Sequence, residues 1–282
     1  MPAQYIVTTD LSARSDRAVE RAIQLLEGRD ARLTIIHVID DELPAAISDV
    51  QEKFARKYIQ EHIADLTGGN KDAVEIQIRF GKPYLEILGA AETLKAEMIV
   101  LGLHREDALK DMFLGTTAER TMRGSKVPVL LVRDRPRGDY ARILVGIDFS
   151  FCSRVALRAA LDLFPRTPLS LVHAYDVPFR GFLHGSGTKR MVHDEHDAAF
   201  RDLVDQELAA LSDRPPASPE IERIMDEGTA GEVLARQVKR LQPDLLVLGT
   251  HGRTGMAHAF FGSVAETFLR SPPCDVLAVK SL

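Results

Sequence analysis

Apolar residues follow two alternating patterns along the chain, short continuous runs and longer stretches with helical spacing. The continuous runs lie at residues 5–9, 33–38, 98–101 and 127–132. Runs of this length predict buried strands, and the alternation of Val74, Ile76 and Ile78 predicts a shorter one. The longest stretch with helical spacing predicts a helix over about 46–66. This order favours an α/β fold with a parallel sheet covered by helices on both faces.

The same order of elements occurs twice, which indicates a tandem duplication. Asp10, at the end of the first run, corresponds to Asp148 at an offset of 138 residues. Further along, Gly102 corresponds to Gly249 at an offset of 147 residues. The larger offset means that the second copy carries about nine additional residues, which we place within 176–196. Two interpretations of this insertion stay open, a flap beside a site and a plain surface insertion.

A polar stretch over 134–140 contains Pro and Gly and is typical of a linker. The chain of 282 residues is also long enough for about two domains. We therefore predict one domain over 1–137 and a second over 138–282.

Composition and charge exclude several classes of protein. The net charge of -5 and the pI near 6.0 provide no basic field that would attract nucleic acid. No apolar run reaches the roughly 20 residues of a membrane span, and the N-terminal sequence lacks the regions of a signal peptide. We therefore expect a cytoplasmic protein with neither nucleic acid nor membrane as a partner. Cys152 and Cys274 are too few for a disulfide framework or a C-x-x-C metal site.

A glycine-bearing loop near the C-terminus is the strongest candidate for chemistry. Gly249, Gly252 and Gly262 form the pattern G-x2-G-x9-G, and Ser263 follows where a helix is expected to begin. Glycines let backbone N–H groups approach an anion, and a helix N-terminus adds unpaired donors, so the pattern suits a phosphate. The alternative is that Gly249 simply ends a strand and that Ser263 and Glu266 form an S-x-x-E capping box.

Taken together, these motifs resemble the universal stress protein family, with one domain of that family in each half of the chain. The resemblance rests on the strand that ends in Asp148, the Leu-Val-His-Ala strand over 171–174, and Gly249-Thr-His-Gly252 followed after nine residues by Gly262-Ser263. It implies two tandem Rossmann-like, doubly wound domains, each with a five-stranded parallel sheet in the order 3-2-1-4-5. Family members with the full glycine pattern bind ATP. The resemblance thus implies a stress-response sensor or regulator that acts through ATP-dependent interactions with other proteins.

The resemblance also implies which residues hold ATP, alone or with Mg²⁺. The adenine and ribose side consists of Gly146, Ile147, Asp148 and Ala174. The ribose and phosphate side consists of Leu248, Gly249, Gly252, Gly262, Ser263 and Val264. Arg253 is either a cation for the phosphates or a solvated loop residue. Sheet geometry agrees with this placement, because ligands of open α/β sheets bind beyond the carboxyl ends of the strands.

The first half departs from the family pattern at one position. Arg105 stands where the second glycine belongs, although Gly115 and Thr116 are kept. A side chain there occupies the space of a phosphate, so we expect the first half to bind ATP at least about tenfold more weakly. The alternative is that Arg105 folds back and supplies positive charge to the phosphate.

No recognised catalytic motif occurs in the sequence, so we assign no catalytic residue and expect at most weak ATP hydrolysis. A scaffold with no bound nucleotide is the alternative to the ATP-dependent regulator. His184, His193 and His196 cluster within the insertion. They are either metal ligands or solvated side chains, and we favour the solvated state.

The sequence identifies no specific protein partner, but the resemblance bears on how the two halves pair. Domains of this family commonly dimerise through their last strand, so the resemblance implies that 127–132 and 274–279 pair within one chain as a pseudo-dimer. Such pairing would cover two sheet edges. A homodimer of two chains is compatible with this arrangement.

Overall fold

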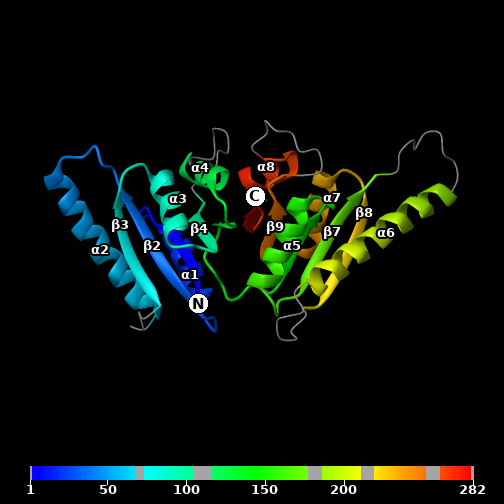
Figure 1. Cartoon of the computed structure of the whole chain (residues 1–282), viewed down its shortest axis with the longest axis horizontal. Helices are drawn as coiled ribbons and strands as arrows, with labels where there is room; N and C mark the ends of the chain where they lie inside the picture. Colours follow the sequence, from blue (N-terminus) through cyan, green and yellow to red (C-terminus); the bar gives the residue numbers. More distant parts are fainter. Residues whose placement is uncertain are drawn as a thin grey trace. The chain divides into compact units, whose positions relative to one another are not determined.

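The computed structural model describes residues 2–67, 73–103, 116–176, 186–210, 219–251 and 261–280. The chain divides into two compact units. Figure 1 colours the chain from blue at the N-terminus to red at the C-terminus. The first unit contains Met1–Asp139 and Arg270–Leu277, and the second contains Tyr140–Leu269 and Ala278–Leu282. Among the described residues, no helix combines the length and apolar character needed to cross a membrane.

The first half alternates strands and helices as the apolar pattern predicts. Its elements are β1 (Ala3–Thr8), α1 (Ala13–Gln24), β2 (Ala31–Ile39), α2 (Ala45–Thr67), β3 (Val74–Phe80), α3 (Pro83–Thr93), β4 (Met98–Gly102), α4 (Thr116–Gly124) and β5 (Val129–Val132). The last strand begins two residues later than predicted. The cause is a turn in which the Val127 N–H donates to Ser125 Oγ at 3.1 Å and Ser125 Oγ donates to the Val127 carbonyl at 2.7 Å.

The second half repeats this order. Its elements are β6 (Ile143–Ile147), α5 (Phe151–Leu163), β7 (Leu169–Tyr175), α6 (Ser186–Ala209), β8 (Ile221–Glu227), α7 (Ala230–Leu241), β9 (Leu245–Gly249), α8 (Ser263–Arg270) and β10 (Asp275–Val279). The insertion predicted within 176–196 is only partly a connection, since α6 already begins at Ser186. The additional residues therefore lengthen both the connection after β7 and the start of the helix.

Both halves have the predicted Rossmann-like sheet. The strand order is β3-β2-β1-β4-β5 in the first half and β8-β7-β6-β9-β10 in the second, which is the order 3-2-1-4-5 in each case. The pairs of β1 with β2 and β4, and of β6 with β7 and β9, are parallel. Right-handed crossovers then place α1 and α2 on one face of the first sheet and α3 and α4 on the other. Contacts of α1 with α2 and of α3 with α4 agree with this.

The order of the strands reverses between β1 and β4, and between β6 and β9, so each half has a switch point there. The central strands at these points are fully apolar inside the sheet: Val7 and Val145 are both completely buried. Burial of a valine side chain contributes about 1.5 to 3 kcal/mol to folding. The hydrophobic core thus fixes the strand ends that border the switch point.

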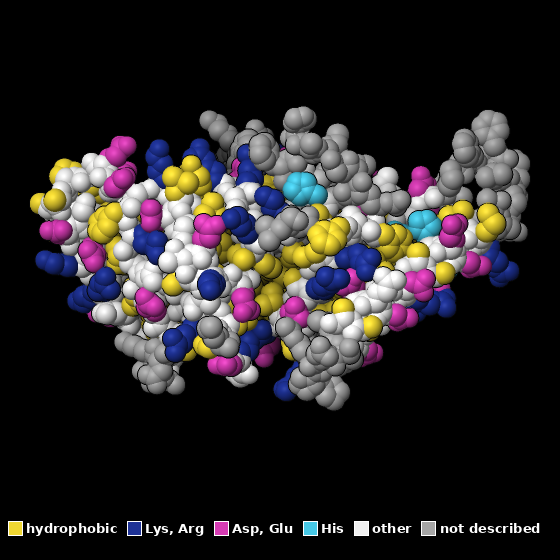
Figure 2. Space-filling model, in the orientation of Figure 1, with side chains coloured by type: hydrophobic (Ala, Val, Ile, Leu, Met, Phe, Trp, Pro, Cys, Tyr) yellow, Lys and Arg dark blue, Asp and Glu magenta, His cyan; other side chains and the backbone are white. Residues whose placement is uncertain are grey.

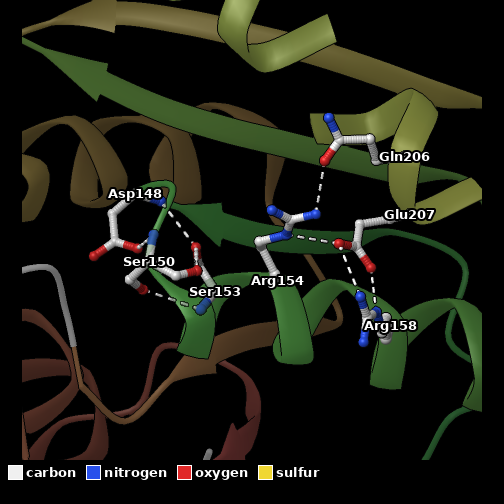
Figure 3. Close-up of polar contacts among 7 residues, drawn as sticks. All are labelled: Asp148, Ser150, Ser153, Arg154, Arg158, Gln206 and Glu207. Carbon is white, nitrogen blue, oxygen red and sulfur yellow. Dashed lines mark hydrogen bonds and ion pairs between the residues drawn. The ribbon is translucent and has the colours of Figure 1, made fainter. Parts of the chain in front are cut away.

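Helix α5 begins beside the switch point of the second half and is tied to α6 by a buried carboxylate. The side chain of Glu207 on α6 is 0% exposed, and Figure 3 shows Arg154 and Arg158 of α5 directed toward it. Arg154 Nε lies 2.7 Å from Glu207 Oε1, and Arg158 Nη2 donates to the same oxygen at 3.2 Å. Burial acts to raise the pKa of Glu207, but hydrogen bonds from Arg158 and Arg154 outweigh it, and the net effect lowers the pKa.

On the face drawn in Figure 2, lysine and arginine side chains are interspersed with aspartate and glutamate on the described part of each unit. This mixture matches the weakly acidic net charge of -5. It offers little long-range attraction for a polyanion.

Candidate functional site

A cavity of about 150 Å³ opens at the carboxyl ends of β6, β7 and β9 in the second half. Nine of the residues that the sequence assigned to ATP line this one cavity. They are Gly146, Ile147, Asp148, Ala174, Leu248, Gly249, Gly262, Ser263 and Val264. Two further predicted residues, Gly252 and Arg253, lie outside the described residues.

Asp148 occupies the turn between β6 and α5 (Figure 3). Its Oδ1 accepts a hydrogen bond from the Ser150 N–H at 3.0 Å, which is the geometry of an Asx-turn. The intervening Phe149 has a left-handed backbone with φ of 63°, as Leu11 has with φ of 64° at the corresponding position of the first half. A non-glycine residue in this region costs about 1 to 2 kcal/mol, so both halves retain a strained turn at the strand end.

The first turn of α8 forms another wall of the cavity. Ser263 is the first helical residue, Gly262 precedes it, and the Glu266 N–H donates to the Gly262 carbonyl at 2.8 Å. The capping-box alternative required Ser263 to be the N-cap, and the structure shows it instead inside the helix. Because Ser263 is exposed and makes no side-chain hydrogen bond within the described part of the chain, its hydroxyl is available at the cavity.

Three helices start at this cavity. Ser153 in the first turn of α5, Ala230 at the start of α7 and Ser263 at the start of α8 all line it. The first N–H groups of a helix lack intrahelical acceptors, and the helix dipole adds partial positive charge at that end. The cavity therefore offers several donors to an anionic ligand although no lysine or arginine is among the described residues that line it.

Some residues of the cavity were not predicted. They are Ser153, Val172, Ala230, Val233, Leu234, His251 and Ala265. The duplication could have indicated Ser153, because it follows Asp148 at the same distance as Ser15 follows Asp10. For the α7 residues no such signal existed, because their position depends on how the helix packs across the sheet.

Gly249 has a packing role as well as a place in the cavity. A Cβ on this residue would lie 2.8 Å from the carbonyl carbon of Cys152 in α5. In the first half, a Cβ on Gly102 would lie 2.9 Å from the Arg14 carbonyl oxygen. The first glycine of the pattern therefore has a steric cause that is independent of any phosphate.

His173 on β7 lies beneath the site and bonds two other groups. Its Nδ1 lies 2.9 Å from the Ile147 carbonyl oxygen, and its Nε2 lies 2.8 Å from Nδ1 of His196 on α6. The ring of Phe149 packs against it at 4.2 Å between centroids. His196 was one of the candidate metal ligands in the sequence. In the structure its Nδ1 is hydrogen-bonded to another histidine.

The other histidines of that cluster do not form a metal site in the part of the chain that the structure describes. His193 lies 3.4 Å from Asp194 on the same helix, and His184 lies outside the described residues. Within those residues no group of three or more His, Cys, Asp or Glu side chains is arranged to hold a metal.

The first half has a cavity at the equivalent strand ends, with a volume of about 350 Å³. Asp10, Ser15 and Gly102 line it, as their counterparts Asp148, Ser153 and Gly249 line the second. Arg105 and Gly115, on which the predicted difference between the halves depends, lie outside the described residues.

Comparisons with known proteins agree with the resemblance seen in the sequence. A model described as the Universal stress protein family matches residues 4–133 and again residues 139–280. A universal stress protein of Mycolicibacterium smegmatis is 28% identical, over 98% of this chain and 96% of that protein. One from Mycobacterium tuberculosis is 26% identical, over 98% of this chain and 95% of that protein. The crystal structure of a universal stress protein from Archaeoglobus fulgidus, at 18% identity and 98% coverage of both chains, has a TM-score of 0.69 and shows the same fold.

Proposed function

This chain belongs to the universal stress protein family, and we propose that its second half binds ATP in the cavity between β6, β9 and the start of α8. Occupancy by ATP would change the association of the protein with other proteins during a stress response. The two parts of the proposal are separate, since a nucleotide can bind without having a regulatory effect.

One observation carries the ATP proposal. Strand ends that are far apart in the sequence, at Asp148 and Gly249, meet the first turn of α8 at one cavity, and Ser263 there is not used as a helix cap. Exposed N–H groups and a free hydroxyl at a helix N-terminus suit phosphate oxygens. The glycine pattern places Gly252 in the same loop in the sequence, where it would leave room for the phosphates.

The opposite wall suits a base and ribose. The residues here are small or apolar and belong to two strands, Gly146 and Ile147 to β6 and Val172 and Ala174 to β7. One carboxylate oxygen of Asp148 accepts from Ser150, and the other is available within the described part of the chain to accept from a ribose hydroxyl or to hold Mg²⁺. A flat apolar wall with one carboxylate at its edge is consistent with an adenosine.

Slow ATP hydrolysis is a second candidate. Asp148 is the only carboxylate among the described residues that line the cavity, so it is the group available to orient water or Mg²⁺. Steady release of phosphate that is lost in Asp148→Ala would favour this activity over binding alone.

Mass spectrometry of small molecules released when the purified protein is denatured tests the proposal. ATP or ADP in about equal amount to the protein supports it. If no nucleotide is released, and ATP added to the native protein produces no heat of binding, the proposal fails and a scaffold without nucleotide is the better account.

A further inference from the structure

Corresponding positions of the two halves line the two cavities, so their walls can be compared residue by residue. Three strand positions are apolar in both cavities: Val172, Ala174 and Leu248 in the second, and Ile36, Val38 and Leu101 in the first. Two neighbouring positions differ, since Gly146 and Ile147, where β6 ends, correspond to Thr8 and Thr9, where β1 ends. The strand wall of the first cavity therefore carries two hydroxyls that the second wall lacks.

Of these two hydroxyls, the one of Thr8 makes no hydrogen bond within the described part of the chain. The other is already bonded, because Oγ1 of Thr9 lies 2.9 Å from Oγ of Ser15. Helix α4 adds a further hydroxyl without a partner among the described residues, since Thr117 lines the first cavity where Val264 lines the second. The first wall thus presents polar atoms that the described part of the chain does not satisfy.

A histidine adds to this contrast. His37 lines the first cavity, and its Nδ1 lies 2.9 Å from the Thr9 carbonyl oxygen. In the neutral ring Nδ1 therefore donates, and Nε2 is left as an acceptor. The counterpart His173 is not among the described residues that line the second cavity, and its Nε2 lies 2.8 Å from Nδ1 of His196. The second half thus turns its histidine to a protein partner, whereas the first half presents it to the cavity.

Gly146 also shapes the second cavity by having no side chain. A Cβ on Gly146 would lie 2.9 Å from Cδ2 of Leu248 and 3.8 Å from Cδ1 of Leu234. Both leucines are buried and line the cavity, whose volume is about 150 Å³. A larger residue at this position would therefore have to displace Leu248 from the wall, besides adding atoms of its own to a small cavity.

A purine that lies flat on the first wall would remove these polar atoms from water, and the face of the ring cannot hydrogen-bond them in return. On the second wall the same ring covers apolar groups. We propose that Gly146 is the residue that admits the adenine base to the second cavity, and that Thr8 excludes the base from the first. This role rests on the proposed binding of ATP by the second half. It concerns the base, whereas the contrast of Gly252 with Arg105 concerns the phosphates.

Displacement of a fluorescent ATP analogue from the nucleotide-free full chain, by ATP and by adenosine, tests the role of Gly146. Adenosine reports on the base and ribose alone, because it has no phosphates. Gly146→Thr should weaken both competitors by the same factor, at least about tenfold. Gly231→Ala in α7 is the control and should change neither, since a Cβ there meets no atom within 4 Å and Gly231 does not line the cavity. If Gly146→Thr does not fold, Gly146→Ala should still weaken both by about threefold or more.

The reciprocal change tests Thr8. The full chain is saturated with ATP and titrated with adenosine in a calorimeter, so that the second cavity is already filled. Thr8→Gly should bind adenosine at least about tenfold more tightly than the wild type. Unchanged adenosine binding in Thr8→Gly, or a folded Gly146→Thr that loses affinity for neither competitor or for ATP alone, would overturn this role and leave the ATP proposal standing. A wild-type chain that binds no ATP would overturn both.

Discussion

Nε2 of His173 lies 2.8 Å from Nδ1 of His196, and this bond joins strand β7 to helix α6 beneath the proposed ATP site. Nδ1 of His173 faces the carbonyl oxygen of Ile147 at 2.9 Å, and a carbonyl can only accept. In the neutral ring Nδ1 of His173 therefore donates, Nε2 accepts, and His196 supplies the proton for the second bond. The residue after Ile147 is Asp148, so the pair supports the strand end at which the site begins.

Substitution His196→Ala should lower the free energy of unfolding by about 1 to 2 kcal/mol, because it removes a donor to the buried His173 ring. Urea denaturation monitored by circular dichroism measures this change. His193→Ala is the matched control on the same helix, since the His193 side chain is 45% exposed and Asp194 is its one charged neighbour in the described part of the chain. The control should change stability by less than about 0.5 kcal/mol. Equal effects of the two variants would contradict a structural role for the pair.

Glu207 makes the stability of the second half sensitive to acid. Its pKa in the folded protein is below the ordinary value of 4.5, since the hydrogen bonds from Arg158 and Arg154 outweigh burial. A group whose pKa is lower in the folded than in the unfolded protein stabilises the fold at pH values above its unfolded pKa. This stabilisation is lost as the pH falls through its folded pKa. Glu207→Gln should therefore be less stable than the wild type at pH 7 by about 2 kcal/mol, with the difference narrowing below pH 4.5. Urea denaturation at a series of pH values checks this, and a constant difference across that range would refute it.

Gly249→Ala should destabilise the protein by about 1 to 3 kcal/mol, because the added Cβ would lie 2.8 Å from the backbone of Cys152. Gly102→Ala should have a similar effect, since its Cβ meets the Arg14 carbonyl oxygen at 2.9 Å. Gly231→Ala in α7 provides the control. A Cβ there meets no atom within 4 Å, and alanine favours a helix over glycine by about 1 kcal/mol. Thermal unfolding should thus show lower midpoints for the first two variants and a higher one for the control.

Ser263→Ala should weaken ATP binding by about tenfold or more, the effect of one lost hydrogen bond to a charged group. Its matched control is Thr267→Ala, one turn further along α8, where the hydroxyl donates to the Ser263 carbonyl and does not line the cavity. Fluorescence titration with a labelled ATP analogue compares the two. If Thr267→Ala weakens binding as much as Ser263→Ala, the effect comes from the helix and not from the serine hydroxyl.

Much of the fold could be predicted because its signals are local. Apolar runs located the strands to within about two residues, and duplication of Asp10 as Asp148 and Gly102 as Gly249 located both switch points. The histidine pair could not be predicted, since His173 and His196 are 23 residues apart and meet only after α6 packs on β7. The place of Thr8 and Thr117 at one cavity could not be predicted either, because β1 and α4 are far apart in the sequence and meet only in the folded domain.

The contrast between Gly252 and Arg105 stays a prediction from the sequence, because both residues lie outside the described part of the chain. The fold of the first half accommodates arginine at this position of the pattern. Gly252→Arg therefore transfers to the second half a residue that the same scaffold already carries. It should remove ATP binding without lowering the unfolding midpoint by more than a few degrees.

The most direct test of the ATP site is a calorimetric titration of ATP into nucleotide-free protein, carried out for the wild type and for Gly252→Arg. We predict about one tight site per wild-type chain, with any second site weaker by about tenfold or more, and no tight site in the variant. Two equivalent sites in the wild type, or unchanged affinity in a folded Gly252→Arg protein, would contradict the assignment of ATP to the second half.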